Sequence, residues 1–163
     1  MNNRQALITT NLGSIRFELL EDVAPKTTEN FILLAKNGYY DGVIFHRVIK
    51  GFMVQGGDPT GTGRGGESAW SGRFDDEISP ASELYRPCYR AGTLAMANSG
   101  PHTNGSQFFI MHADYPLPPS YSIFGRVIEG QKTVDAIACC PTDRQDRPLA
   151  PVIMEKVIIE QVP

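Results

Sequence analysis

Two stretches of the chain decide how it should fold: Phe45-His46-Arg47-Val48-Ile49-Lys50-Gly51-Phe52-Met53-Val54-Gln55-Gly56-Gly57-Asp58 and Met96-Ala97-Asn98-Ser99-Gly100-Pro101-His102-Thr103-Asn104-Gly105-Ser106-Gln107-Phe108-Phe109. In both stretches large apolar side chains surround a few polar ones, and glycines stand where the chain should bend. The cation of Arg47 lies among these apolar residues together with three neutral hydrogen-bonding groups, which are Gln55, Asn98 and Gln107. The pattern predicts an apolar pocket that holds one fixed cation.

Such a pocket offers no obvious nucleophile, no paired carboxylates and no cluster of metal ligands. It is therefore poorly equipped to break a covalent bond. It could still catalyse a rotation about one.

The composition predicts a single domain, residues 1–163, dominated by β-structure. The chain has 163 residues, of which 41% are hydrophobic, 16 are glycine and 12 are proline, and only two stretches have the pattern of a helix. Such a composition favours strands joined by many turns.

The net charge, the apolar segments and the cysteines limit the possible partners and the location of the chain. The net charge is −3 and no basic run is present, so we expect no nucleic-acid partner. No window is long and apolar enough to cross a bilayer, and Met1 to Ala6 lack the pattern of a secretory signal, so we expect no membrane association and a cytoplasmic location. Three cysteines, Cys88, Cys139 and Cys140, give no disulfide framework, and we expect reduced thiols, with a redox switch as the alternative.

The strands are predicted from alternating and short apolar runs. Ala6–Thr10 and Ser14–Leu20 should form a hairpin across Asn11-Leu12-Gly13. Several short strands are expected between Val43 and Phe109, another over Ile123–Val127, and a last one over Val152–Gln161 that returns to pair with the first ones.

Two helices complete the expected architecture. Pro25 suits the first turn of a helix that continues to Lys36 and stops at Asn37-Gly38, and Thr133–Cys140 should form the second, closed by Pro141. Two short helices with many antiparallel strands favour a closed barrel capped at both ends, because closure removes exposed sheet edges.

Several weaker signals have plain interpretations. Gly61-Thr62-Gly63-Arg64-Gly65-Gly66 matches a nucleotide-binding pattern, but no helix follows it, so we interpret it as a flexible loop beside the site. His46, His102 and His112 lack partners at metal-ligand spacing, and we expect His46 to be a hydrogen-bonded structural histidine on the face opposite Arg47. The run Asp75-Asp76-Glu77 is expected to be a solvated turn, and Trp70 can be core or surface.

The two quoted stretches resemble the cyclophilins, and the resemblance extends from the first hairpin to the last strand. It implies an eight-stranded antiparallel barrel with two capping helices, and a peptidyl-prolyl cis-trans isomerase that needs no cofactor and no metal. By the same resemblance Arg47 and Gln55 are the catalytic residues. The residues that it assigns to substrate binding are Phe52, Met53, Ala97, Asn98, Ser99, Gln107, Phe109, Leu117 and Tyr121.

Within that resemblance these residues have distinct roles. Phe52, Met53, Phe109 and Leu117 would form the apolar cup for the proline ring. Gln55 would bond the substrate carbonyl and help to hold Arg47, while Asn98, flanked by Ala97 and Ser99, would offer backbone groups to the peptide. Gln107 would line the same groove.

The chain also departs from the family pattern. The loop Asp114 to Tyr121 lacks the tryptophan that many cyclophilins place before the leucine, here Leu117, and Tyr121 stands where a histidine is expected. We expect turnover to survive this change and the affinity for ciclosporin to be reduced. The segment Ser79–Arg90 looks longer than in the shortest members of the family, and the sequence gives no functional account of it.

The expected partners are proline-containing peptides and unfolded proteins, with the chain acting as a monomer that assists protein folding. The alternative is a proline-segment binding module or holdase chaperone whose isomerase activity is incidental. The presence of Arg47 together with Gln55, which binding alone would not need, favours the enzyme.

Overall fold

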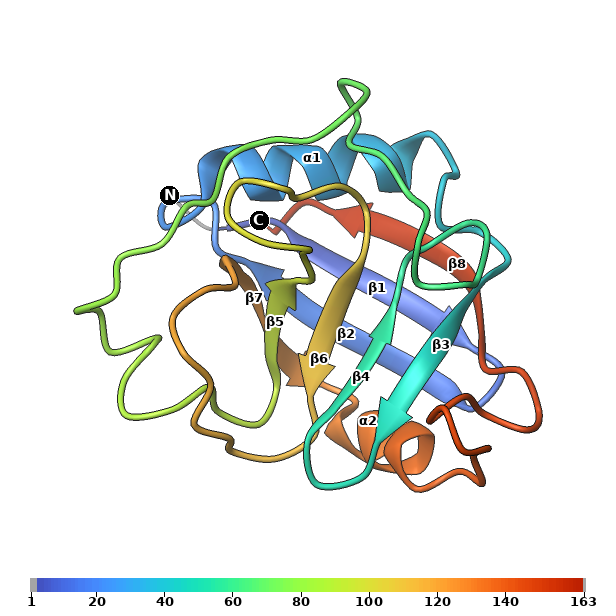
Figure 1. The fold of residues 1–163 in the computed structure, drawn as a ribbon. Helices are drawn as coiled ribbons and strands as arrows, with labels where there is room; N and C mark the ends of the chain where they lie inside the picture. Colours follow the sequence, from blue (N-terminus) through green and yellow to red (C-terminus); the bar gives the residue numbers. More distant parts are fainter. Residues whose placement is uncertain (1–2, 163) are drawn as a thin grey trace.

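Eight strands form a closed antiparallel barrel in a computed structural model that describes residues 3–162 (Figure 1). Met1 and Asn2, the first residues of the N-terminal stretch considered above, lie outside this range. The strands are β1 (Gln5–Thr10), β2 (Gly13–Leu19), β3 (Val43–Ile49), β4 (Met53–Gly56), β5 (Thr93–Met96), β6 (Phe108–Met111), β7 (Ile123–Glu129) and β8 (Ile153–Glu160). Their order around the barrel is β1-β2-β7-β5-β6-β4-β3-β8. The predicted fold is confirmed, and the last strand returns to pair with β1 as expected, while its other neighbour is β3.

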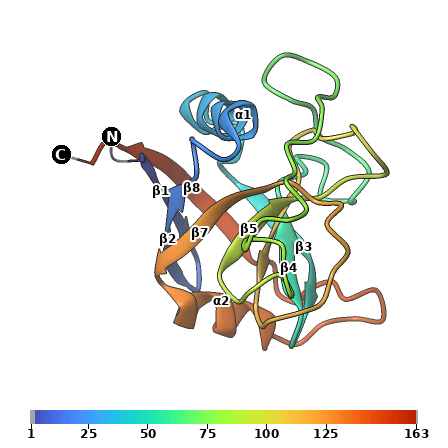
Figure 2. The same cartoon turned by 90° about the vertical axis from the view of Figure 1, so that its left-hand side faces the viewer.

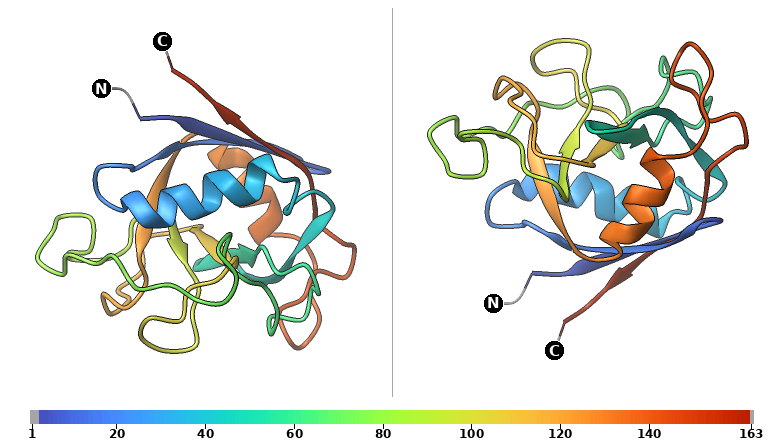
Figure 3. Two further views of the ribbon diagram at one scale, coloured as in Figure 1. Left: turned by 90° about the horizontal axis from the view of Figure 1, so that it is seen from above. Right: turned by 90° about the horizontal axis from the view of Figure 1, so that it is seen from below.

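Two helices cover the two openings of the barrel. Helix α1 (Pro25–Lys36) lies across one end and α2 (Gln131–Ala138) across the other (Figures 2 and 3). Figure 2 also shows that the long connections between β4 and β7 gather on the side of the barrel away from β1, β2 and β8. These connections carry the candidate site.

Helix α1 has the predicted bounds, and its apolar face closes the core. Phe31 is fully buried, and its ring lies between 5.1 and 5.6 Å from four other buried rings, those of Phe17, Tyr40, Phe108 and Phe124. Edge-on and offset contacts of this kind add to the stabilisation from apolar burial. The chain leaves the helix through Gly38, whose φ of +72° is the expected left-handed stop.

Helix α2 differs from its prediction at both ends. It begins two residues before Thr133 and ends at Ala138, before the two cysteines. Gly130, with φ +96°, forms its left-handed N-cap, and its carbonyl accepts from the amides of Thr133 and Val134. The prediction followed the apolar spacing, which the polar residues Gln131 and Lys132 do not share.

A β-bulge interrupts β3 beside the candidate site. The pairing with β4 runs Phe45 to Gly56 and then Arg47 to Gln55, so His46 is an extra residue without an opposite partner. A bulge breaks the simple alternation of faces and re-aims the side chains next to it. The surroundings of His46 and Arg47 nevertheless differ, because His46 is buried and Arg47 is exposed.

Candidate active site

Three predicted site residues stand in one row across the barrel wall. Arg47 of β3 lies opposite Gln55 of β4, and Gln55 lies opposite Phe109 of β6. Residues directly opposite each other in antiparallel strands project from the same face of the sheet. Strand pairing therefore places a guanidinium, a carboxamide and an aromatic ring side by side.

These side chains line a hollow of about 150 Å³, called the proline slot below. It unites nine of the eleven predicted residues, which are Arg47, Phe52, Met53, Gln55, Ala97, Asn98, Phe109, Leu117 and Tyr121. Met53 and Phe109 are almost fully buried. The ring of Tyr121 meets that of Phe109 edge-on at 5.5 Å, and the ring of Phe52 packs against Tyr115 at 4.3 Å. The slot thus has an apolar, largely aromatic wall with polar groups at one side.

A second hollow of about 320 Å³ adjoins the slot and shares Gln55, Ala97 and Asn98 with it. The remaining two predicted residues, Ser99 and Gln107, line this second hollow and not the slot. So do residues that the sequence analysis did not assign, namely Gly63, Arg64, Gly65, Gly66, Arg73, Thr103, Gly105 and Ser106. The glycine-rich loop does lie beside the site, but Arg73 comes from a distant connection that no local pattern marked, and Thr103, although part of the second quoted stretch, was not singled out.

The carboxamide of Gln55 is held by its neighbours on the loop side. Its Nε2 donates to Oε1 of Gln107 at 3.0 Å, and Nε2 of Gln107 donates to the carbonyl of Gly65 at 2.9 Å. These two hydrogen bonds define the orientation of both side-chain amides. They leave the second N–H and the carbonyl oxygen of Gln55 available for other partners. The expected contact that holds Arg47 is absent, since within residues 3–162 no hydrogen bond joins the Gln55 side chain to Arg47.

The guanidinium of Arg47 lies at the slot without a fixed partner. Among the described residues no salt bridge and no side-chain hydrogen bond engages it, and its side chain is exposed. A guanidinium is always protonated and carries five N–H donors in a rigid fork. Arg47 is therefore free to donate to a bound ligand.

His46, the extra residue of the bulge, does not line the slot. It is only 7% exposed, its Nδ1 has no hydrogen-bond partner among residues 3–162, and its Nε2 faces Gly63. The expectation of a hydrogen-bonded histidine is thus wrong for Nδ1. Burial lowers the pKa of His46, chiefly because the charged imidazolium would lose its hydration.

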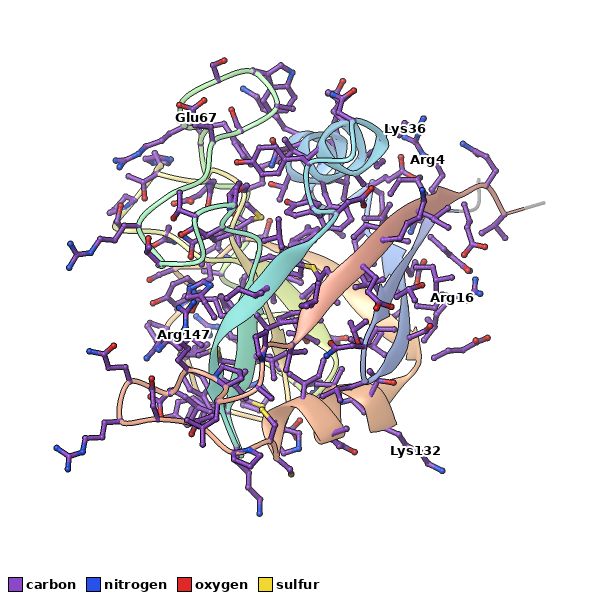
Figure 4. The ribbon with its side chains drawn as sticks, turned by 90° about the vertical axis from the view of Figure 1, so that its right-hand side faces the viewer. Arg4, Arg16, Lys36, Glu67, Lys132 and Arg147 are labelled. Atoms are coloured by element: carbon purple, nitrogen blue, oxygen red, sulfur yellow. The ribbon has the colours of Figure 1, made fainter. Side chains whose placement is uncertain are left out.

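The buried carboxylate of Asp58 organises the loop beside the second hollow. It accepts hydrogen bonds from the amides of Thr60, Thr62, Gly63 and Gly65. Burial alone would raise the pKa of this carboxyl, but the bonds from Gly65, Thr60 and Gly63 outweigh that effect and lower its pKa to about 2. Arg147, labelled beside β3 in Figure 4, pins the same loop by donating to the carbonyl of Gly61 at 2.6 Å.

Asn98 connects two of the loops that border the slot. Its Nδ2 donates to the carbonyl of Ser120 at 2.8 Å, and its Oδ1 accepts from the amide of Gly100 at 3.2 Å. The amide of Ala97 is already bonded to the carbonyl of Gln107. The side chain of Asn98 therefore has a structural task in addition to any role of its backbone.

The acidic run is not the solvated turn that was expected. Glu77 accepts hydrogen bonds from the amides of Lys26 and Thr27 at the first turn of α1, and Asp76 accepts from Nδ2 of Asn104. Only Asp75 is largely exposed. Trp70 is a surface residue, 41% exposed, with the ammonium of Lys26 5.5 Å from its ring centroid.

Metal clusters and membrane-spanning helices would indicate other classes of function. In the part of the chain that the structure describes, no group of three or more His, Cys, Asp or Glu side chains could hold a metal ion. No helix among those residues has the length and apolar character needed to traverse a bilayer.

Comparisons with known proteins point to one family. A family model described as cyclophilin type peptidyl-prolyl cis-trans isomerase/CLD matches residues 6–159. Among curated proteins, the chain is 51% identical over 155 residues to the peptidyl-prolyl cis-trans isomerase CYP18-1 of Arabidopsis thaliana, covering 94% of each chain. It is 52% identical over 152 residues to the peptidyl-prolyl cis-trans isomerase ppi1 of Schizosaccharomyces pombe, covering 93% of this chain and 96% of that one.

Solved structures agree with the sequence comparisons. A crystal structure of a cyclophilin type peptidyl-prolyl cis-trans isomerase from Cryptosporidium parvum superposes with a TM-score of 0.91 at 44% identity, over 99% of each chain. A second crystal structure of that protein, in the presence of the dipeptide Ala-Pro, gives a TM-score of 0.90 at 43% identity, over 97% of this chain and 99% of the other.

Proposed function

We propose, because this chain belongs to the cyclophilin-type peptidyl-prolyl cis-trans isomerase family, that its isomerase activity resides in the proline slot, with Arg47 and Gln55 as the catalytic residues. The observation that carries the proposal is the unpartnered guanidinium of Arg47 beside an apolar cup. The reaction is rotation about the bond between a residue and a following proline.

Rotation is slow without a catalyst because it must break amide resonance, at a barrier of about 18–20 kcal/mol. In the twisted transition state the proline nitrogen regains a lone pair and becomes a hydrogen-bond acceptor. An N–H of Arg47 aimed at that nitrogen binds the twisted state better than the planar one, and such differential binding is what accelerates a reaction. Each 1.36 kcal/mol of preference speeds the rotation about tenfold.

The other slot residues support this donor. Phe52, Met53, Phe109 and Leu117 receive the proline ring and exclude water, which strengthens the attraction between Arg47 and the nitrogen. The second N–H of Gln55, the one not bonded to Gln107, is available for the substrate carbonyl. Ala97, Asn98, Ser99, Gln107 and Tyr121 border the path of the peptide on either side.

The test is an isomerisation assay on a short X-Pro peptide, followed by exchange NMR. The wild type should exceed the uncatalysed rate, and Arg47→Ala should lose most of that excess. Arg144→Ala, which removes an exposed arginine from the turn before β8, is the matched control and should behave as the wild type. Equal activity of Arg47→Ala and the wild type would contradict the catalytic role of Arg47.

We also propose where the enzyme works and on which chains. It acts as a monomer on exposed X-Pro bonds of unfolded or flexible chains, assisting their folding, in the cytoplasm. The three free cysteines suit a reducing compartment. Fractionation of cells that produce the tagged chain tests the location. Acceleration of the refolding of a protein whose folding is limited by proline isomerisation tests the folding role.

Ciclosporin should bind this chain weakly. Pro116 precedes Leu117 where many cyclophilins carry a tryptophan, and proline offers neither the area nor the N–H of an indole. Pro116→Trp should therefore lower the ciclosporin concentration that inhibits the isomerase by half. No change in this concentration would contradict the assignment.

A further inference from the structure

The segment Ser79–Arg90 packs next to the proline slot. It contains two buried tyrosines, Tyr85 and Tyr89, whose rings meet edge-on at 5.6 Å. Both belong to an apolar cluster that also includes Met53 and Phe109 of the slot. In Figure 1 the segment runs beside β5, on the same side as the connection between β6 and β7.

Tyr89 holds that connection at two places. Its backbone forms an isolated antiparallel bridge with Tyr115, with the two N–H to C=O bonds both at 2.9 Å. Its hydroxyl donates to the carbonyl of Tyr121 at 2.8 Å and accepts from the amide of the same residue at 3.3 Å. One fully buried residue thus grips both ends of the stretch Tyr115–Tyr121.

This stretch needs external support because it has little structure of its own. It contains three prolines and belongs to no strand or helix. Its internal bonds are two short turns, and among the described residues its other side-chain hydrogen bond is the one from Asn98 to Ser120. The rings of Tyr115 and Tyr121 also pack against Phe52 and Phe109. Leu117 and Tyr121, which form one wall of the slot, both lie within it.

We propose that Tyr89 is a positioning residue for the isomerase reaction: its hydroxyl keeps the wall formed by Leu117 and Tyr121 in place, so that the slot is formed before the peptide arrives. This role rests on the function proposed for the slot. It also gives the segment Ser79–Arg90 a task, which is to brace the slot from behind.

The effect of removing the hydroxyl follows from how a partly formed site binds. Without it, the amide and carbonyl of Tyr121 lose their partner, and the stretch spends more time away from the slot. The apparent dissociation constant of a ligand rises in inverse proportion to the fraction of molecules with a competent site. Ground state and transition state bind to the same slot, so KM rises while kcat changes little.

Tyr85 provides a matched control. It lies four positions earlier in the same segment, it is equally buried, and its hydroxyl also makes two backbone bonds. Those bonds lead elsewhere, because it accepts from the amide of Ile123 at 2.9 Å and donates to the carbonyl of Glu77 at 3.4 Å. Tyr85→Phe and Tyr89→Phe therefore remove the same group from the same environment, and only the second removes it from the slot wall.

The experiment compares wild type, Tyr85→Phe, Tyr89→Phe and Arg47→Ala by exchange NMR on an X-Pro peptide, with kcat and KM measured separately. We expect KM to rise about 3- to 10-fold in Tyr89→Phe with kcat within about 2-fold, and both constants to stay within about 2-fold in Tyr85→Phe. Amide hydrogen exchange provides the local readout. Protection should fall at Tyr121 in Tyr89→Phe and at Ile123 in Tyr85→Phe.

The outcomes separate this role from its alternatives. Equal KM values for the two tyrosine variants, or a Tyr121 amide that keeps its protection in Tyr89→Phe, would overturn the positioning role. A fall in kcat without a rise in KM would also overturn it. If the function proposed for the slot is wrong, Arg47→Ala will instead be as active as the wild type. That measurement uses a protein with Tyr89 intact, so the two failures can be distinguished.

Discussion

At the scale of single residues, the site depends on charges whose state is fixed by their surroundings. Arg47 supplies the positive charge of a guanidinium, with its N–H donors in a rigid fork. His46, next to it in the sequence, is kept neutral in the native protein, because burial lowers its pKa from 6.5. Above about pH 6.5 the cation of Arg47 therefore has an uncharged imidazole as its neighbour in β3.

The pH profile of the reaction should follow from these two groups. Because the pKa of His46 is lower in the folded state than in the unfolded one, its neutral form and the stability linked to it persist above about pH 6.5 and are lost as the pH falls below that value. We expect kcat/KM to be constant between about pH 6.5 and 9 for a peptide without titratable groups. A sigmoid or bell-shaped profile inside this window would show that a titrating group takes part in the reaction.

Asp58 should contribute to stability in a way that acid removes. Its pKa of about 2 lies below the usual 3.8, so its contribution is present above about pH 4 and lost as the pH falls through about 2. A shift of this size corresponds to about 2 kcal/mol of unfolding free energy. Asp58→Asn should therefore lose about 2 kcal/mol or more in urea unfolding at pH 7.

The pH dependence is the specific part of that prediction. The deficit of Asp58→Asn relative to the wild type should shrink when unfolding is repeated at about pH 2.5, where the wild-type carboxyl begins to protonate. Asp22→Asn, at an exposed carboxylate, is the control and should cost little at either pH. An equal deficit at both pH values would mean that the charge of Asp58 is not what the loop requires.

At the scale of elements, the first turn of α1 is completed by a residue from a distant loop. The residue before the helix, Ala24, has no side chain that could cap it. Glu77 replaces the cap: its carboxylate accepts from the amide of Thr27 at 2.6 Å, from the Thr27 hydroxyl at 2.8 Å and from the amide of Lys26 at 3.3 Å. A carboxylate there also interacts favourably with the helix dipole.

Removing that charge should loosen the helix that closes the core. Glu77→Gln keeps the size of the side chain and should lower the unfolding free energy by about 1 kcal/mol, a fall in Tm of about 2–4 °C. Glu83→Gln, on an exposed residue of the same loop, should leave Tm nearly unchanged. Equal Tm values for the two variants, measured by thermal unfolding, would argue against the cap.

Glu77 also illustrates which features the sequence could predict. Four strands (β1, β2, β7 and β8) and α1 follow local apolar periodicity, so their predicted bounds agree with the structure to within one or two residues. For β3 to β6 the sequence predicted only several short strands between Val43 and Phe109. The cap joins residues 50 positions apart, and no local pattern reports such a contact. For the same reason the run Asp75-Asp76-Glu77 looked like a solvated turn.

The candidate site divides in a similar way. Arg47, Gln55 and the apolar cup were identified through the resemblance of two continuous stretches and, for Leu117, of the loop Asp114 to Tyr121, and the structure brings them together. The second hollow escaped prediction in part, because Arg73 reaches it from a connection separate from the one that carries Thr103 and Gln107. The bulge at His46 was also hidden, since an extra residue in a strand is visible only once the partner strand is known.

At the scale of the whole molecule, closure of the barrel affects whether copies of the chain can associate through their sheets. Within residues 3–162 each of the eight strands pairs on both sides. A sheet without free edges offers no template for pairing with another copy. We therefore expect sedimentation of the purified protein at tens of micromolar to give one species of 17.9 kDa, whereas a species of twice that mass would contradict the monomer.

The barrel also fixes the positions of side chains that line the slot. The barrel wall fixes the row of Arg47, Gln55 and Phe109 through strand pairing, whereas the opposite wall depends on loops that Tyr89 and Asn98 hold in place. Rigid strands thus carry the catalytic groups, and braced loops complete the apolar cup.

The most direct test of the central claim separates binding from rotation in a single variant. Affinity for an Ala-Pro peptide is measured by NMR titration, and kcat by exchange spectroscopy, for the wild type and Arg47→Ala. If Arg47 stabilises the twisted bond, kcat should fall about 100-fold or more while the dissociation constant changes by less than about 3-fold. The account would be contradicted if kcat stayed unchanged and the dissociation constant rose by the same factor by which kcat/KM fell. Arg47 would then only bind the planar peptide.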